Sequence, residues 1–595
     1  IASIIIYSGS VISQEKKGNE TFSSSTTAKD MKIVTPTFDK PVLPINEDGT
    51  HYYVNNKRRR NEFTNSENAL PKGGDPLLKT KAKKSSHPNK APLANWDGLN
   101  SNESGGATPP DPSGAAGPNH YVQMVNSVYR IFDKNGTALT APAALGTLLG
   151  GGNAGDPIVM YDKFADRWFL SQFSHQNELI VAVSKSPDPT GAYFLYTFQL
   201  SSFPDYPKYS IWSDGYYIAA NKSGNNAFVM ERDKMIAGDP NAQIISFTIP
   251  SLSTPGFFSV LPATASSTLP AVGTPNYLFY FQDDAWAGGT DKLKIWEVNV
   301  DWTTTSNSSI SAPQSLGVSP FDSEFSPFWN DITQPGTTAK IDGVPGALMY
   351  MGHYRSFPSH NSIVLNHTVD VNGSNLAGIR WYELRKVGTN PWTLYQEGTF
   401  SPDTENRWMG SIAMDFKGNI GLAYSVSGAT TYPSIKYTGR YATDPLGEMT
   451  ISEGVIVNGT SSQTHTNRFG DYAHMTIDPT DDATFWYTGE YISNGWKTRI
   501  ASFKITDAIS GIDTEEETST VNLELTTLPN NQFEINIKNM DELVNTTIIN
   551  TLGQELLNKQ FTDQQSLNLN HLPTGYYLLK VANTKFSKTR KIWVK

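Results

Sequence analysis

The chain has 595 residues, 11% of them aromatic and only 17% charged, and this length allows several ordinary domains or one large all-β unit with attachments. It contains no cysteine, which excludes disulfides, thiolate metal sites and cysteine nucleophiles. The formal net charge is −10 and the basic residues concentrate in one stretch, residues 51–90, so we expect no basic surface that binds nucleic acid.

The first 92 residues are predicted to lie outside the folded core. Residues 1–13 include an apolar run that is too short to cross a bilayer and looks like the later part of a signal peptide cleaved near Gln14, although a frayed first strand is the alternative. Residues 14–92 are polar and rich in Ser, Thr, Asn and Lys, so we predict a disordered, basic segment. No other stretch is apolar for long enough to predict a transmembrane segment.

Residues 93–506 repeat one pattern, in which a Gly-, Pro- or Asp-rich lead-in precedes an apolar strand, a tight turn and an aromatic-rich strand. Residues 158–200 and 208–250 each divide into four strands, which is typical of a β-propeller blade. Further units begin near Tyr121, Tyr277, Ala347, Ile412 and Met475. The predicted fold class is therefore all-β, a propeller of seven four-stranded blades. Six or eight blades, or a pair of β-sandwiches, are the alternatives.

Two more segments follow the predicted propeller. Residues 507–520 are short, acidic and poor in strand-forming residues, which indicates a linker. Residues 521–595 alternate apolar and polar positions, as in the pairs Phe533 and Ile535 or Leu579 and Val581. We predict a small Ig-like β-sandwich there.

The C-terminal segment also carries three ordered motifs. A turn at Leu552-Gly553 is followed by NLNHLPTGYY from Asn568 to Tyr577 and by a Lys-rich strand that ends at Lys595. These residues resemble the type A C-terminal sorting domain of the Bacteroidota type IX secretion system, with Asn531 as a departure where that family usually has a second Pro. The resemblance implies passage through the periplasm, contact with the type IX secretion machinery, and secretion or attachment to the outer cell surface. An ordinary carbohydrate-binding or spacer sandwich is the alternative.

The central region resembles large, uncharacterised, secreted bacterial propeller proteins. The resemblance rests on PPDPSGAAGPNHYVQMVN at residues 109–126 and on GDYAHMTIDPTDDATFWYT at residues 470–488. No specific activity comes with it.

Acidic residues recur at the lead-ins to predicted strands. If each precedes an innermost strand, they gather at one mouth of the central channel, where clustered carboxylates could bind calcium or raise one another's pKa for general-acid catalysis. Calcium is the one cofactor that the sequence suggests. The alternative is that each Asp caps its own loop. The candidates are Asp156, Asp205, Asp331 and Asp471.

Aromatic and basic residues near blade starts form a second candidate site. Arg407 and Arg468 could neutralise a carboxylate or sulfate, and Trp408 could stack on a sugar ring together with substrate contacts from Asp205 and Asp471. Tyr472 with His474 could remove and return a proton, as β-elimination of a uronic acid polymer requires. The alternative is that these side chains pack between blades.

A third candidate site lies in GHYRSFPSHNSIVLNHT, at residues 352–368. His353 and Arg355 are two positions apart on a predicted strand and so share a face, which makes them catalytic candidates, with Tyr354 as a substrate contact. The His spacing matches no recognised zinc motif.

The function predicted from these features is a secreted or surface propeller that binds an extracellular glycan or protein through its loop face, because no HExxH, GxSxG or Asp-box motif occurs. The main alternative is an extracellular polysaccharide-degrading lyase or glycoside hydrolase. A structural adhesin is a third hypothesis.

Overall fold

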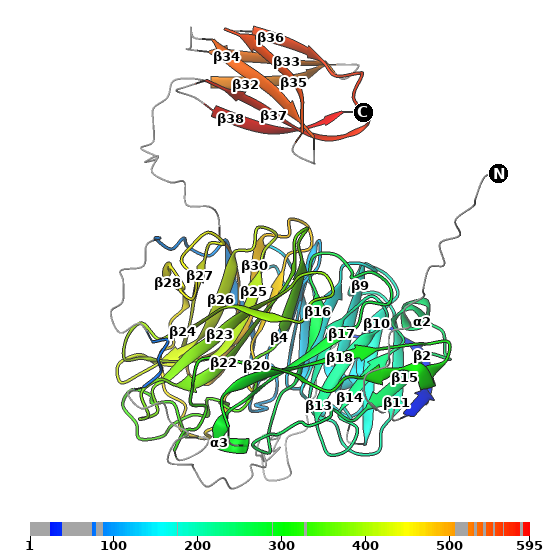
Figure 1. Cartoon of the computed structure of the whole chain (residues 1–595), viewed down its shortest axis with the longest axis vertical. Coiled ribbons are helices and arrows are strands. Elements are labelled where there is room, and N and C mark those ends of the chain that lie inside the picture. The colour runs from blue at the N-terminus through cyan, green and yellow to red at the C-terminus, as the bar shows by residue number, and fades with distance from the viewer. Residues whose placement is uncertain are drawn as a thin grey trace, which may run out of the picture. The chain divides into compact units, whose positions relative to one another are not determined.

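The computed structural model describes residues 24–38, 74–78, 87–174, 176–287, 289–326, 330–505, 522–528, 532–538, 543–550, 554–562, 564–583 and 587–594. The chain divides into two compact units, Ile1–Asp507 and Ala508–Lys595 (Figure 1). The predicted signal peptide at residues 1–13 and the predicted linker at 507–520 lie outside the described residues, apart from the unit boundary that falls in the linker. In the described part of the chain, no helix has the length and apolar character that crossing a membrane requires.

The first unit consists of antiparallel sheets built from consecutive strands. The first sheet contains β4 (Ser113–Ala116), β5 (His120–Val125), β6 (Val128–Asp133) and β7 (Ala143–Ala144). The second contains β8 (Ile158–Asp162), β9 (Arg167–Phe173), β10 (Glu178–Ser184) and β11 (Tyr193–Gln199). The third contains β12 (Asp205–Ile211), β13 (Tyr216–Asn221), β14 (Ala227–Met230) and β15 (Gln243–Phe247).

The next two sheets are joined by parallel pairing of their first strands, β16 and β21. The fourth sheet contains β16 (Leu261–Ala265), β17 (Asn276–Gln282), β18 (Lys292–Asn299), β19 (Ser309–Ile310) and β20 (Gln314–Gly317). The fifth contains β21 (Gly352–Ser356), β22 (Asn361–Asp370), β23 (Ala377–Lys386) and β24 (Thr393–Phe400). Short helices decorate the unit: α1 (Leu145–Leu149), α2 (Arg232–Ala237), α3 (Asp284–Ala287) and a 3₁₀ turn at Thr305–Asn307.

The last two sheets close the ring. The sixth contains β25 (Asn406–Met414), β26 (Ile420–Ser427), β27 (Ser434–Arg440) and β28 (Ile451–Val457). The seventh contains β29 (His474–Ile477), β30 (Thr484–Ile492) and β31 (Trp496–Lys504), and its outer strand is β3 (Ala94–Asn100) from the N-terminal side. Since β3 precedes the first sheet in sequence and completes the last one, it ties the two ends of the ring together.

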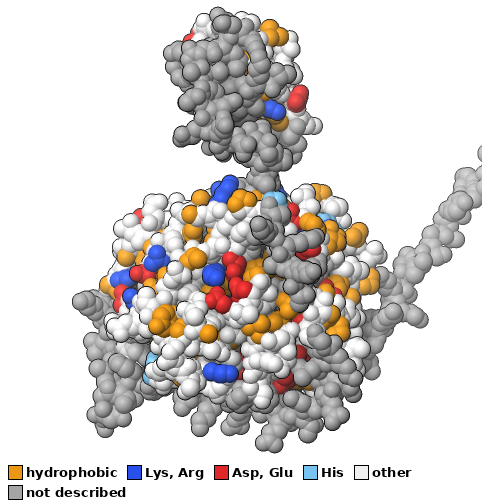
Figure 2. Space-filling model, turned by 90° about the vertical axis from the view of Figure 1, so that its left-hand side faces the viewer, with side chains coloured by type: hydrophobic (Ala, Val, Ile, Leu, Met, Phe, Trp, Pro, Cys, Tyr) orange, Lys and Arg blue, Asp and Glu red, His pale blue; other side chains and the backbone are white. Residues whose placement is uncertain are grey.

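The first strands of these sheets, here called the inner strands, surround the centre of the unit. In the order β4, β8, β12, β16, β21, β25 and β29, each contacts the next, and β29 contacts β4. This closed cycle is that of a seven-bladed β-propeller, so the prediction is confirmed. On the face in Figure 2, acidic and basic side chains of this unit lie intermixed among uncharged ones.

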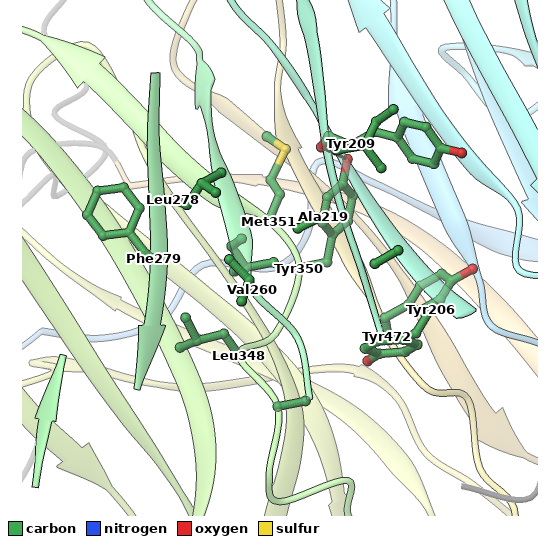
Figure 3. Packing of buried hydrophobic residues seen from close by; sticks show 14 of the residues in the cluster. Tyr206, Tyr209, Ala219, Val260, Leu278, Phe279, Leu348, Tyr350, Met351 and Tyr472 are labelled. Atoms are coloured by element: carbon green, nitrogen blue, oxygen red, sulfur yellow. Dashed lines mark hydrogen bonds between the residues drawn. The ribbon is translucent and has the colours of Figure 1, made fainter. Parts of the chain in front are cut away.

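Asp residues shape the turns that follow the inner strands. The Asp162 carboxylate accepts hydrogen bonds from the main-chain N–H groups of Phe164 and Ala165, and Asp415 does the same for Lys417 and Asn419. Such local bonds fix a tight turn at low cost in chain entropy. Between the blades, apolar and aromatic side chains from neighbouring sheets pack in several clusters, one of which is seen in part in Figure 3.

The structure differs from the prediction of disorder for residues 14–92 at Ser24–Val34. β1 (Ser24–Thr27) pairs with β15, and β2 (Asp30–Val34) pairs with β11, so each adds an outer strand to a blade. An outer strand is held mainly by main-chain hydrogen bonds and has little need of apolar side chains. A polar sequence can therefore form such a strand without showing an apolar strand pattern. Asp75 is tied in too, by a buried ion pair with Arg380 at 2.9 Å.

The second unit is a small sandwich of two sheets. One contains β32 (Asn522–Leu528), β33 (Gln532–Lys538) and β36 (Gln564–Asn568), and the other contains β34 (Val544–Ile549), β35 (Glu555–Phe561), β37 (Gly575–Ala582) and β38 (Ser587–Val594). Residues from both sheets share one core, which includes Phe533, Ile535, Leu579 and Val581, the alternating positions noted in the sequence. This agrees with the predicted Ig-like sandwich.

Candidate functional site at the two ends of the central channel

Four carboxylates meet where the inner strands begin, and we call them the acid cluster: Asp111, Asp156, Asp205 and Asp471. Asp111 and Asp156 each stand two residues before an inner strand, Asp205 opens β12, and Asp471 precedes β29. Burial raises the pKa of Asp156 well above its usual value, and the charges of the other three carboxylates raise it further. Three of the four predicted calcium candidates, Asp156, Asp205 and Asp471, are thus brought together.

The fourth calcium candidate, Asp331, has a different place. It is fully buried between β20 and β21, and its Oδ2 accepts a hydrogen bond from the Gly343 N–H at 3.0 Å. Asp331 thus lies within the long connection from β20 to β21 and does not stand directly before an inner strand. Among the described residues, the carboxylates close enough together to share a metal ion are those of Asp283, Asp284 and Asp291, all within 4.8 Å of one another.

The chain supplies its own cation to the acid cluster. Lys208 on β12 is fully buried, and its Nζ lies 3.3 Å from the ring centre of Tyr206 and 4.3 Å from that of Tyr472. Figure 3 shows these two tyrosines side by side. Burial lowers the pKa of Lys208 to about 8, and the four carboxylates oppose that shift. The ammonium group thus balances part of the buried negative charge.

Main-chain and amide hydrogen bonds hold the cluster in place. Asp111 accepts one bond from Asn126 Nδ2 at 2.7 Å and another from the Asp471 N–H at 2.6 Å. Arg468 donates to both oxygens of Asp471 at 2.9 Å. Burial, with the Asp471 charge second, raises the pKa of Asp111 to about 7. A further buried carboxyl, that of Glu490, lies beside Asp111 and Asp471, and its Oε2 accepts a bond from the Gly470 N–H at 2.5 Å.

Several predicted site residues are engaged in packing. The Tyr472 hydroxyl donates to the Pro157 carbonyl at 2.9 Å, and the residue is 1% exposed. Arg407, fully buried, forms bidentate pairs with Asp403 and Glu453. Trp408 packs on Phe469 with ring centres 5.2 Å apart, and Tyr354 packs on Trp212 at 4.8 Å. Trp408 and Tyr472 thus fit the alternative in which these side chains pack between blades, whereas Arg407 is paired with carboxylates.

Further along the same inner strands lies a cavity of about 50 Å³, here called the channel cavity. Its walls come from β4, β8, β12, β16, β21 and β29 and from the turns after them. The polar residues of its lining are Tyr161, Lys163, Thr264, Ser266, His353, His474 and Thr476. None of the described residues that line it is Asp or Glu.

Two predicted catalytic candidates, His353 and His474, both line this cavity. His353 Nδ1 accepts a bond from the Met414 N–H at 3.4 Å, and His474 Nδ1 accepts one from the Gly114 N–H at 3.3 Å. Burial lowers the pKa of His474 to about 3, with Lys208 as the second cause, and burial also holds the pKa of His353 well below its usual value. Both rings are neutral, and neither Nε2 has a hydrogen-bond partner.

Three turns meet at the outer rim of the channel cavity, and we call this surface the turn face. Asp482 receives two bonds from Arg355, at 2.7 and 2.8 Å, and lies 3.4 Å from Lys163 Nζ. The Asp482 carbonyl also accepts a bond from the Phe416 N–H at 3.0 Å. The predicted candidate Arg355 therefore helps to hold this rim together.

Sequence reasoning missed several residues of both sites. Asp111 had a usable signal, because PDP at residues 110–112 repeats the GDP of residues 155–157 before an inner strand. No such signal marked Lys208, Lys163, Thr264 or Thr476. Single Lys and Thr residues on strands are common, and these can be recognised as site residues only when the closed ring brings them together.

Comparisons with known proteins bear on the two units differently. Residues 529–595 match the family described as a secretion system C-terminal sorting domain, which confirms the resemblance noted in the sequence. No curated protein matches the sequence.

Among solved structures, the chain is similar to the WD40 domain of SCAP from fission yeast (9% identity, TM-score 0.30, covering 65% of this chain and 82% of that one). It is also similar to an α-L-arabinofuranosidase from Podospora anserina in complex with cellotriose (12% identity, TM-score 0.26, covering 73% of this chain and 99% of that one). A third similar structure is a polysaccharide lyase, an ulvan lyase, bound to an oligosaccharide (10% identity, TM-score 0.27, covering 76% of this chain and 93% of that one). Similarities of this size say nothing about the chemistry of this chain.

Proposed function

Because the C-terminal unit is a secretion system sorting domain, we propose that the type IX machinery exports the chain through the periplasm and that its propeller binds an extracellular glycan at the turn face. The sorting domain implies export to the cell surface or secretion. The identity of the ligand and the binding role of the propeller are the proposed steps.

The observation that carries the proposal is the channel cavity with its rim. The cavity presents hydrogen-bond donors without partners, as a site for a polar ligand requires. Next to it, the Phe416 ring is 50% exposed although its main chain is tied to Asp482. An exposed ring beside polar donors suits a sugar, which has both an apolar face and many hydroxyls.

The placement of the ionisable groups favours binding over catalysis. Tyr472 and Arg407 are enclosed and already bonded to groups of the chain, so a polymer would have to displace those bonds to reach them. The enzyme alternative has one observation in its favour, since burial moves the pKa of Asp111 up to about 7 and that of Lys208 down to about 8, near the range of working acids and bases. Both groups are nevertheless buried.

A panel of acidic and neutral polysaccharides, incubated with the full chain, tests the proposal. We expect retention of the protein on at least one immobilised polymer and no release of unsaturated or reducing ends. Release of such ends would establish the lyase or hydrolase alternative. Retention on none of the polymers, with capture of a surface protein, would point to a protein ligand and contradict the glycan proposal.

The rim can be tested by removing its exposed ring. Phe416→Ala should weaken polymer retention about fivefold, because a stacking contact of about 1 kcal/mol is lost. Tyr395→Ala is the matched control, since that ring is also partly exposed but lies on the outer strand β24. Equal losses in both variants would place binding elsewhere.

Removal of residues 521–595 tests the export step. The shortened chain should accumulate in the periplasm, while the full chain reaches the medium or the cell surface. Unchanged delivery of the shortened chain would contradict a sorting role for this unit.

A further inference from the structure

We infer that the channel cavity binds a single oxyanion, a carboxylate or a sulfate group carried by the extracellular ligand. The inference rests on the proposed function and narrows it to acidic glycans. Three features support it: the state of the two histidines, the placement of two hydroxyls, and the balance of charge at the rim.

The histidines that line the cavity each carry an N–H donor without a partner. In each ring Nδ1 accepts a main-chain N–H from the wall, Met414 for His353 and Gly114 for His474, so the ring proton is on Nε2. His353 is 1% exposed and His474 is fully buried, and both Nε2 atoms are without a partner. Because both residues line the cavity and their Nδ1 atoms face the wall, these donors need an acceptor that comes from outside the chain.

Each histidine has a hydroxyl next to it on the same wall. Thr264 pairs directly with His353 where β16 and β21 run parallel, so their side chains point to the same face of that sheet. Thr476 is two residues after His474 on β29 and shares its face for the same reason. Neither threonine hydroxyl has a hydrogen-bond partner. Two separate walls therefore each offer one imidazole N–H and one hydroxyl.

The charges near the cavity favour an anion over a cation. Lys163 and Arg355 both reach the carboxylate of Asp482 at the rim, and the charge of Arg355 also acts on the buried carboxyl of Asp415. No Asp or Glu is among the described lining residues, although the whole chain carries a net charge of −10. Anions are bound by such donor sets, whereas calcium needs oxygen ligands.

The size of the cavity limits the ligand to one small group. About 50 Å³ is available, and a single water needs roughly 10–15 Å³ of such space. A carboxylate or sulfate fits that volume and a whole sugar ring does not. The rest of an acidic sugar would then lie outside, on the turn face beside Phe416.

The test is calorimetric titration of the full chain, at constant ionic strength, with sodium sulfate, sodium glucuronate and glucose. We expect binding of at least one anion and none of glucose. The double variant Thr264→Val/Thr476→Val keeps the shape of both side chains and should lower anion affinity about tenfold or more. Thr368→Val is the matched control, because Thr368 on β22 is also buried with an unpartnered hydroxyl but does not line the cavity. It should bind as the unaltered chain does.

Sulfate alone would assign a sulfated ligand, and glucuronate alone a uronate; either supports the inference. It is overturned if neither anion binds, or if the double variant, shown to be folded by its unfolding transition, binds as tightly as the control. Lys163→Met adds an independent check, since it removes a positive charge at the partly exposed rim and should weaken binding of either anion severalfold. Polymer retention without anion binding would leave the proposed function standing and remove this inference. Anion binding without polymer retention would leave the anion site standing and contradict the proposed function.

Discussion

The acid cluster and the channel cavity differ in how their buried polar groups are paired. Where the strands begin, the chain brings four carboxylates together and provides Lys208 and Arg468 to balance them. Further along the strands, it leaves two imidazole N–H groups and two hydroxyls without partners around a cavity. Buried polar groups are nearly always satisfied in folded proteins. The difference therefore separates a site that the fold needs from one that a ligand completes.

The largest expected effect tests whether the acid cluster is structural. Lys208→Met removes the buried cation and leaves its carboxylates uncompensated, so we expect the propeller to lose about 3–5 kcal/mol of unfolding free energy in denaturant titrations. Lys294→Met is the control, because that Lys is also mostly buried but donates to a carbonyl, that of Ser251 at 2.6 Å. It should lose about 1 kcal/mol. Equal losses would mean that the charges of the acid cluster do not matter.

The second effect is the pH dependence of stability. The folded pKa of Asp111, about 7, is above its usual value of 3.8, so the folded state binds more protons than the unfolded state between these values. Its contribution to stability is present in full below about pH 4 and is lost as the pH rises through 7. Relative to Asp111→Asn, the unaltered chain should lose on the order of 3 kcal/mol between pH 4.5 and 7.5.

Any constant cost of the Asn substitution cancels in this comparison, because only the slope with pH is read. Asp301→Asn is a control in the same unit, since hydrogen bonds from a turn lower the pKa of Asp301 and its titration is over below pH 4.5. It should leave the slope unchanged. A slope for Asp111→Asn that matches the unaltered chain would show that Asp111 is ionised throughout.

The sequence predicted the ring and one of its two sites in outline. Asp before an inner strand is a local signal, and Asp156, Asp205 and Asp471 do meet. His353 and His474 were singled out for catalysis, and the structure brings both to the channel cavity, in the neutral state. The site residues that were not predicted depend on contacts between blades. Thr264, for example, is placed in the site by its pairing with His353, which lies far along the chain. The outer strands β1 and β2 escaped prediction because main-chain bonds hold them.

The smallest effect compares two hydroxyls of the inner strands in the absence of ligand. Ser411 Oγ donates to the Tyr350 carbonyl at 2.7 Å and accepts the Met475 N–H at 2.9 Å, so Ser411→Ala should cost about 1 kcal/mol. Thr264 Oγ1 is buried without a partner, so Thr264→Val removes an unmet desolvation cost and should leave unfolding free energy unchanged or raise it by up to about 1 kcal/mol. Thermal unfolding of both variants measures the contrast. If Thr264→Val destabilises the ligand-free chain as much as Ser411→Ala does, the hydroxyl is already satisfied within the fold, and the distinction between the acid cluster and the channel cavity fails.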